Sequence, residues 1–400
     1  MRINPPAAYV ILYALMYAAF GVASPFWPEY FRAKALSSQE IGVLLGAAMV
    51  VRLAAGPLVG RLADISESLR SVLGGCAALA AAMAAALSFA DSFVMLLCVA
   101  LAQAAALAPM TSIADALSVS AARPQIAGKP FEYGWIRGAA SAAFASGTII
   151  IGQFIRPDHL DPVVWLNAML LLAAAGATAL LPPVRTPAEP RTSKSADRMG
   201  MHPLLRIPRF RSVLTVSALV YGSHAMHDAF AVIRWSDSGI AAPVISLLWS
   251  EAVAAEVVVF FLIGPALVHH LGARGAASVA ALAGIVRWTV GGTTTSILLL
   301  SLVQPLHGLT FALLHLACMR ILGAVVPTKL SATAQTVYAF GSGLVTAVIT
   351  AMSGVLYARY AGASFVAMAG LCAAALPFAW LGFGAGSPPP GGGVARAGSL

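Results

Sequence analysis

The sequence predicts an all-α membrane protein with twelve transmembrane helices in two six-helix bundles. Of its 400 residues, 60% are hydrophobic and only 10% are charged, whereas an ordinary soluble domain is about 25% charged. So few polar groups cannot cover the surface of a globular protein in water. About twenty apolar residues span a bilayer, so twelve spans need about 240 residues and leave chain for loops and one linker. This composition excludes a disordered chain, a collagen, a coiled coil and a soluble enzyme.

Uncharged stretches mark six of the expected spans, and each exceeds or nearly reaches the thickness of a bilayer. They contain no Lys, Arg, Asp, Glu or His and cover residues 3–28, 71–90, 92–114, 162–184, 330–358 and 360–395. Six further apolar stretches are interrupted by ionisable groups, at about residues 39–60, 133–155, 211–235, 244–268, 276–292 and 294–320. Ser37 and Glu40 form the pattern of a capping box, which predicts that the second span begins there.

The composition changes abruptly between residues 185 and 210, where Pro, Ser, Thr, Lys and Arg dominate. Such a segment neither enters lipid nor folds alone. We predict a cytoplasmic linker here, between an N-terminal bundle (residues 1–184) and a C-terminal bundle (residues 211–384). The Pro- and Gly-rich residues 385–400 are predicted to form a disordered cytoplasmic tail. With both termini cytoplasmic, roughly sixteen of the 24 Lys and Arg residues fall on the cytoplasmic side, as the positive-inside rule requires.

The two halves share a short motif. Gly56-Pro57 near the end of the second expected span recurs as Gly264-Pro265 near the end of the eighth, and a short basic loop follows each. Two six-helix units in parallel repeat imply a substrate site between the halves near the midplane, with alternating access by rocking.

Ionisable side chains inside the spans are the candidates for proton coupling. Each costs a few kcal/mol to insert, so each should face a partner or a wet cavity. Glu256 lies in the middle of its span with apolar residues on both sides, and a desolvated carboxyl group there suits reversible proton loading; the alternative is a structural ion pair. His224 and Asp228 share a face of the seventh span, as a proton relay or a substrate pair. His307 is the fourth coupling candidate.

The tenth span carries a stripe of candidate substrate-binding residues. His307, Phe311 and His315 follow the spacing i, i+4, i+8, and Gln304 lies beside His307. A histidine stripe next to an aromatic side chain suits a cavity wall. The alternative is that both imidazoles bond to carbonyl or hydroxyl groups between packed helices. Trp249 is a candidate aromatic wall for a ring-bearing substrate.

Three arginines inside spans, Arg52, Arg137 and Arg287, are candidates to hold a substrate carboxylate through two parallel hydrogen bonds. For Arg137 the alternative is an ion pair with Asp115 or Glu132. Asp115 is itself a binding candidate, because the helix-weakening stretch before it would open backbone to the cavity. Tyr17 is a further aromatic candidate; for any one aromatic residue, packing at the lipid interface is the alternative.

Motifs spread over nearly the whole chain resemble those of the major facilitator superfamily. Gly60 and Asp64 match its loop signature after the second span, although Ile65 stands where a basic residue is expected. Closer matches resemble the phenylpropionate permease-like group, which is related to the oligosaccharide and nucleoside proton symporters. These matches are residues 25–31 (PFWPEYF), 133–137 (YGWIR), 222–225 (GSHA), Trp249 with Glu256, and 304–311 (QPLHGLTF) with His315.

The resemblance implies a multi-pass transporter of the bacterial inner membrane, and a gating role for Gly60 and Asp64. The leading hypothesis is a proton symporter for a small organic solute, for example an aromatic carboxylate such as 3-phenylpropionate. A nucleoside or sugar symporter and a drug or metabolite efflux antiporter are alternatives.

A membrane enzyme or a sensor is the other class. The sequence lacks G-x-S-x-G, H-E-x-x-H and Walker motifs, so we expect no enzyme and no ATP-driven transport. We expect a monomer that contacts its substrate, protons and lipid, with no nucleic acid, no cofactor and no metal. The four cysteines lie far apart within apolar runs and are interpreted as small buried hydrophobic residues.

Overall fold

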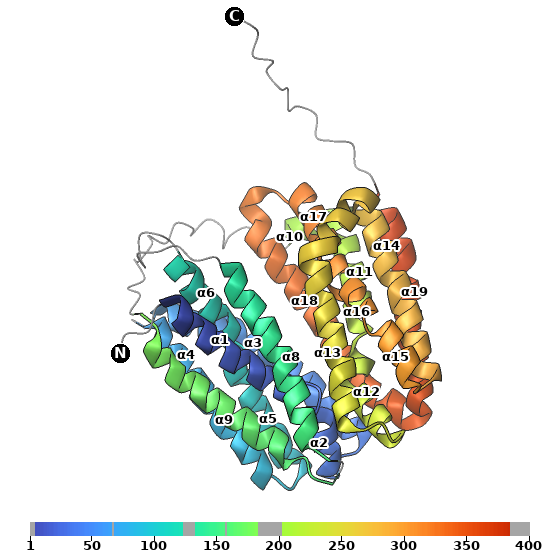
Figure 1. Cartoon of the computed structure of the whole chain (residues 1–400). Helices are drawn as coiled ribbons and strands as arrows, with labels where there is room; N and C mark the ends of the chain where they lie inside the picture. Colours follow the sequence, from blue (N-terminus) through green and yellow to red (C-terminus); the bar gives the residue numbers. More distant parts are fainter. Residues whose placement is uncertain (1–4, 66–67, 123–132, 157, 183–201, 385–400) are drawn as a thin grey trace, which may run out of the picture.

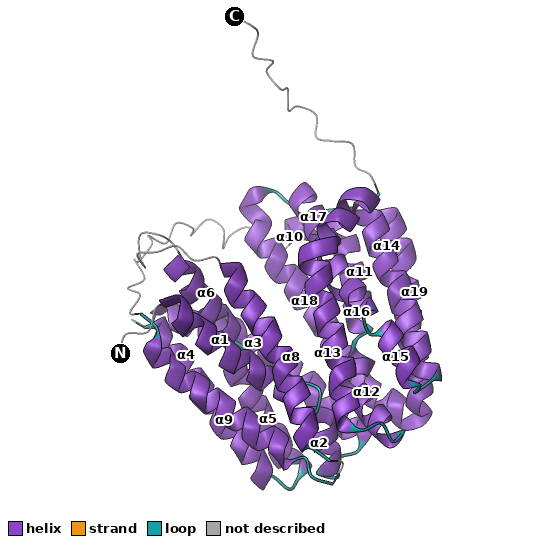
Figure 2. Cartoon of the chain, viewed as in Figure 1, coloured by secondary structure: helices purple, strands orange, loops and turns teal. Residues whose placement is uncertain are grey.

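The chain is helical throughout its described residues. The structure, a computed structural model, describes residues 5–65, 68–122, 133–156, 158–182 and 202–384, and these ranges contain one isolated bridge and no strand (Figure 2). Helices follow from the apolar composition, because a backbone in lipid must bond its own N–H and C=O groups. Most of the predicted linker and the whole predicted tail lie outside the described residues.

The helices form two halves, which Figure 1 shows side by side. The N-terminal half contains α1 (Pro5–Ala23), α2 (Trp27–Ala33), α3 (Ser38–Ile65), α4 (Leu69–Ala86), α5 (Phe93–Leu107), α6 (Met110–Ala122), α8 (Tyr133–Phe154) and α9 (Asp161–Ala177). The C-terminal half contains α10 (His202–Leu205), α11 (Pro208–Gly222), α12 (Ala225–Asp237), α13 (Ala242–Val258), α14 (Gly264–Thr293), α15 (Ile297–Val303), α16 (Leu306–Gly308), α17 (Leu314–Val325), α18 (Ser331–Tyr360) and α19 (Phe365–Gly382). Two π-helical turns, Val259–Ile263 and Leu309–Leu313, follow α13 and α16.

The lengths of the apolar helices are consistent with twelve spans. Within the described residues, 8 segments are long and apolar enough to cross a membrane, and two of them, Ala242–Thr293 and Thr328–Gly382, run for 52 and 55 residues. Each of these two is long enough to cross twice. The first bends at Gly272, whose φ of 67° is a conformation that glycine adopts at little cost. The more polar α8 and the pair α11–α12 supply the remaining two expected crossings.

The second span begins where the sequence predicts. The Ser37 backbone N–H donates to Glu40 Oε2 at 2.8 Å, and the Glu40 N–H donates to Ser37 Oγ at 3.3 Å. The reciprocal pair confirms the capping box and starts α3. At its other end α3 continues to Ile65, so Gly60 and Asp64 lie in helix. Their predicted placement in a loop is therefore wrong, because residues 61–65 contain no Gly or Pro that would end the helix.

The halves meet at one end, called here the distal end, which is opposite the start of α1 and the end of α19 (Figure 1). There α3 packs on α18, and α8 packs on α13. A Cβ atom on Gly42 would lie 2.9 Å from Gly354 Cα, so glycine is required for this approach. By contrast, a Cβ on Gly56 or Gly60, farther along α3, would meet nothing within 4 Å. The halves therefore touch at the distal end and stand apart at the other, terminal end.

An ion pair also joins the halves at the distal end. Arg32 of α2 pairs with Asp237 at the end of α12. The same guanidinium donates to Glu29 Oε1 at 2.5 Å within its own helix. Arg32 therefore links the two halves at the end where they are closed.

Candidate functional site

A cavity of about 720 Å³ lies between the two halves, within the size range of small-molecule sites. α2, α3, α5 and α8 line it from the N-terminal half, and α11 to α14 and α16 to α18 line it from the C-terminal half. Nine of the predicted site residues lie on its wall: Arg52, His224, Asp228, Trp249, Glu256, Arg287, His307, Phe311 and His315. The fold thus brings together side chains from spans far apart in the sequence.

Arg287 of α14 is the centre of the polar network in the C-terminal half. It is only 2% exposed, and its guanidinium donates to His307 Nδ1 at 3.0 Å and to Gln304 Oε1 at 3.0 Å. It also approaches His227 Nε2 at 3.4 Å and lies 4.5 Å from the ring centroid of Trp288. These contacts occupy its two terminal nitrogens, whereas Arg287 Nε is buried and has no hydrogen-bond partner within the described residues.

The guanidinium determines which nitrogens of the two histidines carry the proton. Arginine only donates hydrogen bonds, so the imidazole nitrogens that face Arg287 must be acceptors. The proton of His307 then lies on Nε2, which is 3.4 Å from Glu256 Oε2. The proton of His227 lies on Nδ1, which is 3.3 Å from Asp228 Oδ1. Both histidines are therefore neutral and connect Arg287 to the two carboxylates.

Tryptophans hold the His227 ring in this orientation. The ring stacks on Trp249 with centroids 4.9 Å apart and 26° between the planes. Trp235 and Trp288 contact it at centroid distances of 5.7 Å. With the imidazole fixed, its N–H group points at Asp228, whose side chain is 58% exposed.

His224 packs among the same rings. Its centroid is 5.1 Å from that of His307 and 5.2 Å from that of Trp288. Its Nε2 atom is buried and has no hydrogen-bond partner within the described residues. His224 and Asp228 line one cavity, but the hydrogen-bond partner of Asp228 is His227. The predicted pairing of His224 with Asp228 is therefore not seen.

π-helical turns follow both Glu256 and His307. A π turn bonds residue i to i+5 and takes more residues than an α turn. In a π turn, the side chains of residues i and i+4 are therefore offset by a smaller angle around the helix axis than in an α-helix. The rings of His307 and Phe311 stack 5.6 Å apart, and His315 lies on the same cavity wall.

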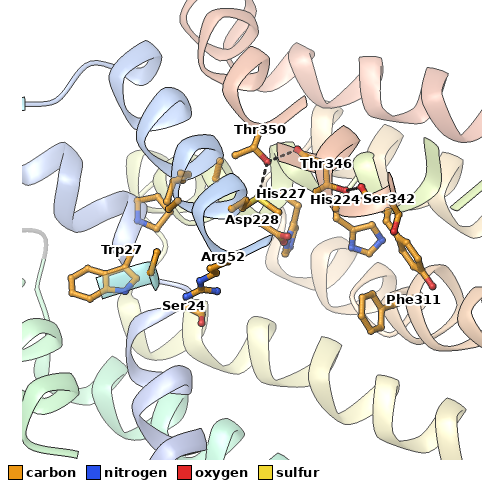
Figure 3. A pocket seen from close by; sticks show the side chains of 18 of the residues that line it. Ser24, Trp27, Arg52, His224, His227, Asp228, Phe311, Ser342, Thr346 and Thr350 are labelled. Atoms are coloured by element: carbon orange, nitrogen blue, oxygen red, sulfur yellow. Dashed lines mark hydrogen bonds and ion pairs between the residues drawn. The ribbon is translucent and has the colours of Figure 1, made fainter. Parts of the chain in front are cut away.

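Arg52 is the cation that the N-terminal half presents to the cavity. It projects from α3 and lines the same cavity as Asp228 and His224 (Figure 3). Within the described residues no hydrogen bond or ion pair involves its guanidinium, and the residue is exposed to the cavity. An arginine in this position is free to hold an anion.

Arg137, Asp115 and Tyr17 form a separate cluster inside the N-terminal half. Arg137 donates to Tyr17 Oη at 2.6 Å and lies 3.7 Å from Asp115 Oδ1, to which Tyr13 also donates at 2.5 Å. None of the three lines the cavity. The alternative of an Arg137–Asp115 pair is therefore the one that the structure contains, while Glu132 lies outside the described residues.

Two further predicted residues stand away from the cavity. Gln304 is 2% exposed and lies behind Arg287, so it positions that guanidinium and does not face the cavity. Gly60 has open space around it, so it makes no gating contact in this conformation. A gating role for Gly60 and Asp64 stays a prediction.

Two features of this wall were not predicted from the sequence. The first is His227, which lies between Arg287 and Asp228. The second is a ladder of hydroxyl groups on α18, formed by Ser342, Thr346 and Thr350 (Figure 3). Their spacing of four residues in an otherwise apolar span is a helical face and could have revealed them.

Two helical halves that close a polar cavity at one end and stand apart at the other define a membrane transporter of the major facilitator fold, not an enzyme. The chain belongs to the MFS_1-like family, whose model matches residues 7–369.

Known proteins support this assignment. The chain is 29% identical over 352 residues to the "Probable 3-phenylpropionic acid transporter" of Escherichia coli, covering 88% of this chain and 90% of that one. It is 25% identical over 358 residues to the "Maltose permease" of Geobacillus stearothermophilus, covering 88% of each. The solved structure of the nucleoside transporter NupG matches with a TM-score of 0.83 at 17% identity, covering 94% of this chain and 99% of that one.

A bacterial homologue of the lysosomal transporter Spinster, solved in an inward-facing and unoccupied conformation, matches with a TM-score of 0.73 at 16% identity. That match covers 94% of this chain and 95% of the other. Because the sequence identities to these solved structures are only 17% and 16%, the matches establish the fold alone.

Proposed function

We propose that this protein is a proton symporter for a small organic anion, most simply an aromatic carboxylate, in the bacterial inner membrane. The charge balance of the cavity carries the proposal. Its wall holds two guanidinium groups, Arg52 and Arg287, and two carboxylates, Asp228 and Glu256, while hydrogen bonding from Arg287 keeps His227 and His307 neutral. A carboxylate bound at Arg52 adds one negative charge, and one proton restores the balance.

Glu256 is the best acceptor for that proton. Its side chain is 32% exposed, so water in the cavity reaches it, and His307 contacts it from the buried side. Protonation removes the charge that faces the His307 N–H, and it lowers the repulsion that an incoming carboxylate would meet. His224, His307 and Asp228 complete the proposed coupling group, since they lie within the same cluster of rings and hydrogen bonds.

Aromatic side chains favour a ring in the substrate. Trp27 and Phe31 line the cavity from α2, and Trp249 and Phe311 line it from the C-terminal half. A pair of aromatic rings in contact contributes about 0.5–1.5 kcal/mol of interaction free energy in addition to the contribution from burying their surface. The name of the Escherichia coli relative, a probable 3-phenylpropionic acid transporter, supports the same substrate class.

The conformation corresponds to one step of transport. We propose that both termini are cytoplasmic, as the positive-inside bias favours. The closed distal end then faces outward and the cavity opens inward. Arg32, Asp237, Gly42 and Gly354 would separate when the cavity opens to the outside.

A nucleoside or sugar symporter is the second candidate. The hydroxyl groups of α18 favour it, because such substrates bond through their own hydroxyls, and the maltose permease relative and the NupG fold agree with it. In that mechanism Arg52 would not hold an anion.

Transport by purified protein in liposomes with an imposed pH gradient separates these candidates. Radiolabelled 3-phenylpropionate, uridine and lactose are supplied in parallel. Accumulation of 3-phenylpropionate that an uncoupler abolishes supports the proposal. Accumulation of uridine or lactose alone supports the second candidate, and gradient-driven export would indicate an efflux antiporter.

A further inference from the structure

The hydrogen-bonding groups of the cavity define the ligand more narrowly than its charge does. Asp228 engages His227 through Oδ1, and Glu256 engages His307 through Oε2. Within the described residues, Asp228 Oδ2 and Glu256 Oε1 have no hydrogen-bond partner. The Asp228 and Glu256 side chains are 58% and 32% exposed. Each carboxylate therefore offers a free acceptor to the cavity.

The hydroxyl ladder of α18 adds further acceptors. Ser342 donates to Tyr338 O at 2.7 Å, Thr346 to Ser342 O at 2.9 Å and Thr350 to Thr346 O at 2.9 Å. Each hydroxyl has only one proton to donate but can accept through its oxygen. Thr350 Oγ1 also lies 3.5 Å from Met49 Sδ. Ser342 and Thr350 are only 6% and 4% exposed, so the ladder adds a few partly buried acceptor oxygens to the cavity wall (Figure 3).

Resting on the proposed function, we propose that the substrate is a hydroxylated organic acid. Its carboxylate binds Arg52, and at least one of its hydroxyl groups donates to Asp228. An unsubstituted phenyl ring has no hydrogen-bond donor. It would displace water from these acceptors without replacing the hydrogen bonds that the water donates.

Asp228 is the decisive acceptor among these groups. In its ionised form it carries a full charge, it is more exposed than Glu256, and His227 contacts its Oδ1 atom. Glu256, once protonated, can itself donate, and the α18 oxygens are neutral. A hydrogen bond to a charged group corresponds to about tenfold or more in Kd.

Binding to the purified protein tests the inference, with quenching of tryptophan fluorescence as the signal because Trp27 and Trp249 line the cavity. The ligands are 3-phenylpropionate, its three monohydroxyphenyl isomers and D-glucuronate. At least one hydroxylated acid should bind about tenfold more tightly than 3-phenylpropionate. Asp228→Ala should remove this preference while Ser24→Ala, a matched change on the cavity wall, keeps it.

The outcomes distinguish this inference from the proposed function. Equal Kd values for 3-phenylpropionate and every hydroxylated acid would overturn the inference and leave an aromatic carboxylate symporter intact. A preference that survives unchanged in Asp228→Ala would also overturn it. Failure of all the acids to bind would overturn both.

Discussion

Replacing Glu256 with glutamine should separate transport from its driving force. Glutamine keeps the size and hydrogen-bonding capacity of the side chain but cannot take up a proton. If Glu256 carries the coupled proton, the variant should still bind its substrate and exchange it across the membrane. It should no longer accumulate substrate against a gradient.

The magnitude follows from the proton gradient. One pH unit is worth about 1.4 kcal/mol per proton, so symport with one proton should concentrate a solute about tenfold at equilibrium across a gradient of one unit. The Glu256→Gln variant should equilibrate its substrate at a ratio of about one under the same gradient. Counterflow, in which labelled substrate exchanges for unlabelled substrate, should remain within about threefold of the wild-type rate.

Glu251→Gln is the matched control. Glu251 lies in the same helix, α13, but does not line the cavity, and it accepts a hydrogen bond from Ser301 at 2.9 Å. This variant should keep tenfold accumulation. Wild-type accumulation by Glu256→Gln, or loss of accumulation in both variants, would refute the assignment of the proton to Glu256.

Three further predictions concern binding, opening and stability. Arg52→Gln should raise the Kd for an organic acid by about tenfold, because two hydrogen bonds to the carboxylate are lost; equal affinity in titrations of the two proteins would contradict this. Gly42→Ala should hinder distal closure, increasing labelling of cysteines placed at the distal end of the cavity, whereas Gly56→Ala, with open space around it, should label as the parent does. Ser37→Ala should lower the free energy of unfolding by about 1 kcal/mol through loss of the cap of α3, measured by denaturant titration in detergent; an unchanged midpoint would speak against the cap.

The sequence predicts the helices better than it predicts the partners within the site. Composition and span length are local properties, so the helical membrane fold and the cap at Ser37 follow directly. The cavity positions of Glu256 and His307 follow from the cost of burying polar groups in lipid. That cost also predicted a partner for Arg137, but it could not decide between Asp115 and a substrate, because the choice depends on how α6 packs against α8.

The role of Arg287 also could not be predicted from the sequence alone. In the sequence it is one of three arginines within spans, with nothing to distinguish it from Arg52. Only the tertiary structure surrounds Arg287 with His227, Gln304 and His307. It leaves the Arg52 guanidinium without a hydrogen bond to any described residue. The difference between a structural and a binding arginine is therefore a property of tertiary contacts.

The proposed proton site and the proposed anion site lie in different halves, and this placement links substrate binding to movement of the halves. The proposed proton site lies wholly in the C-terminal half, whereas Arg52, whose guanidinium has no hydrogen bond to any described residue, lies in the N-terminal half. A substrate that binds Arg52 and Asp228 together bridges the halves and lowers the free energy of bringing them closer at the terminal end. Without a proton on Glu256, the two carboxylates of the C-terminal half would repel the bound anion and oppose that approach. Proton and substrate together would then favour the change of access that neither favours alone, which is the requirement for tight coupling in a symporter.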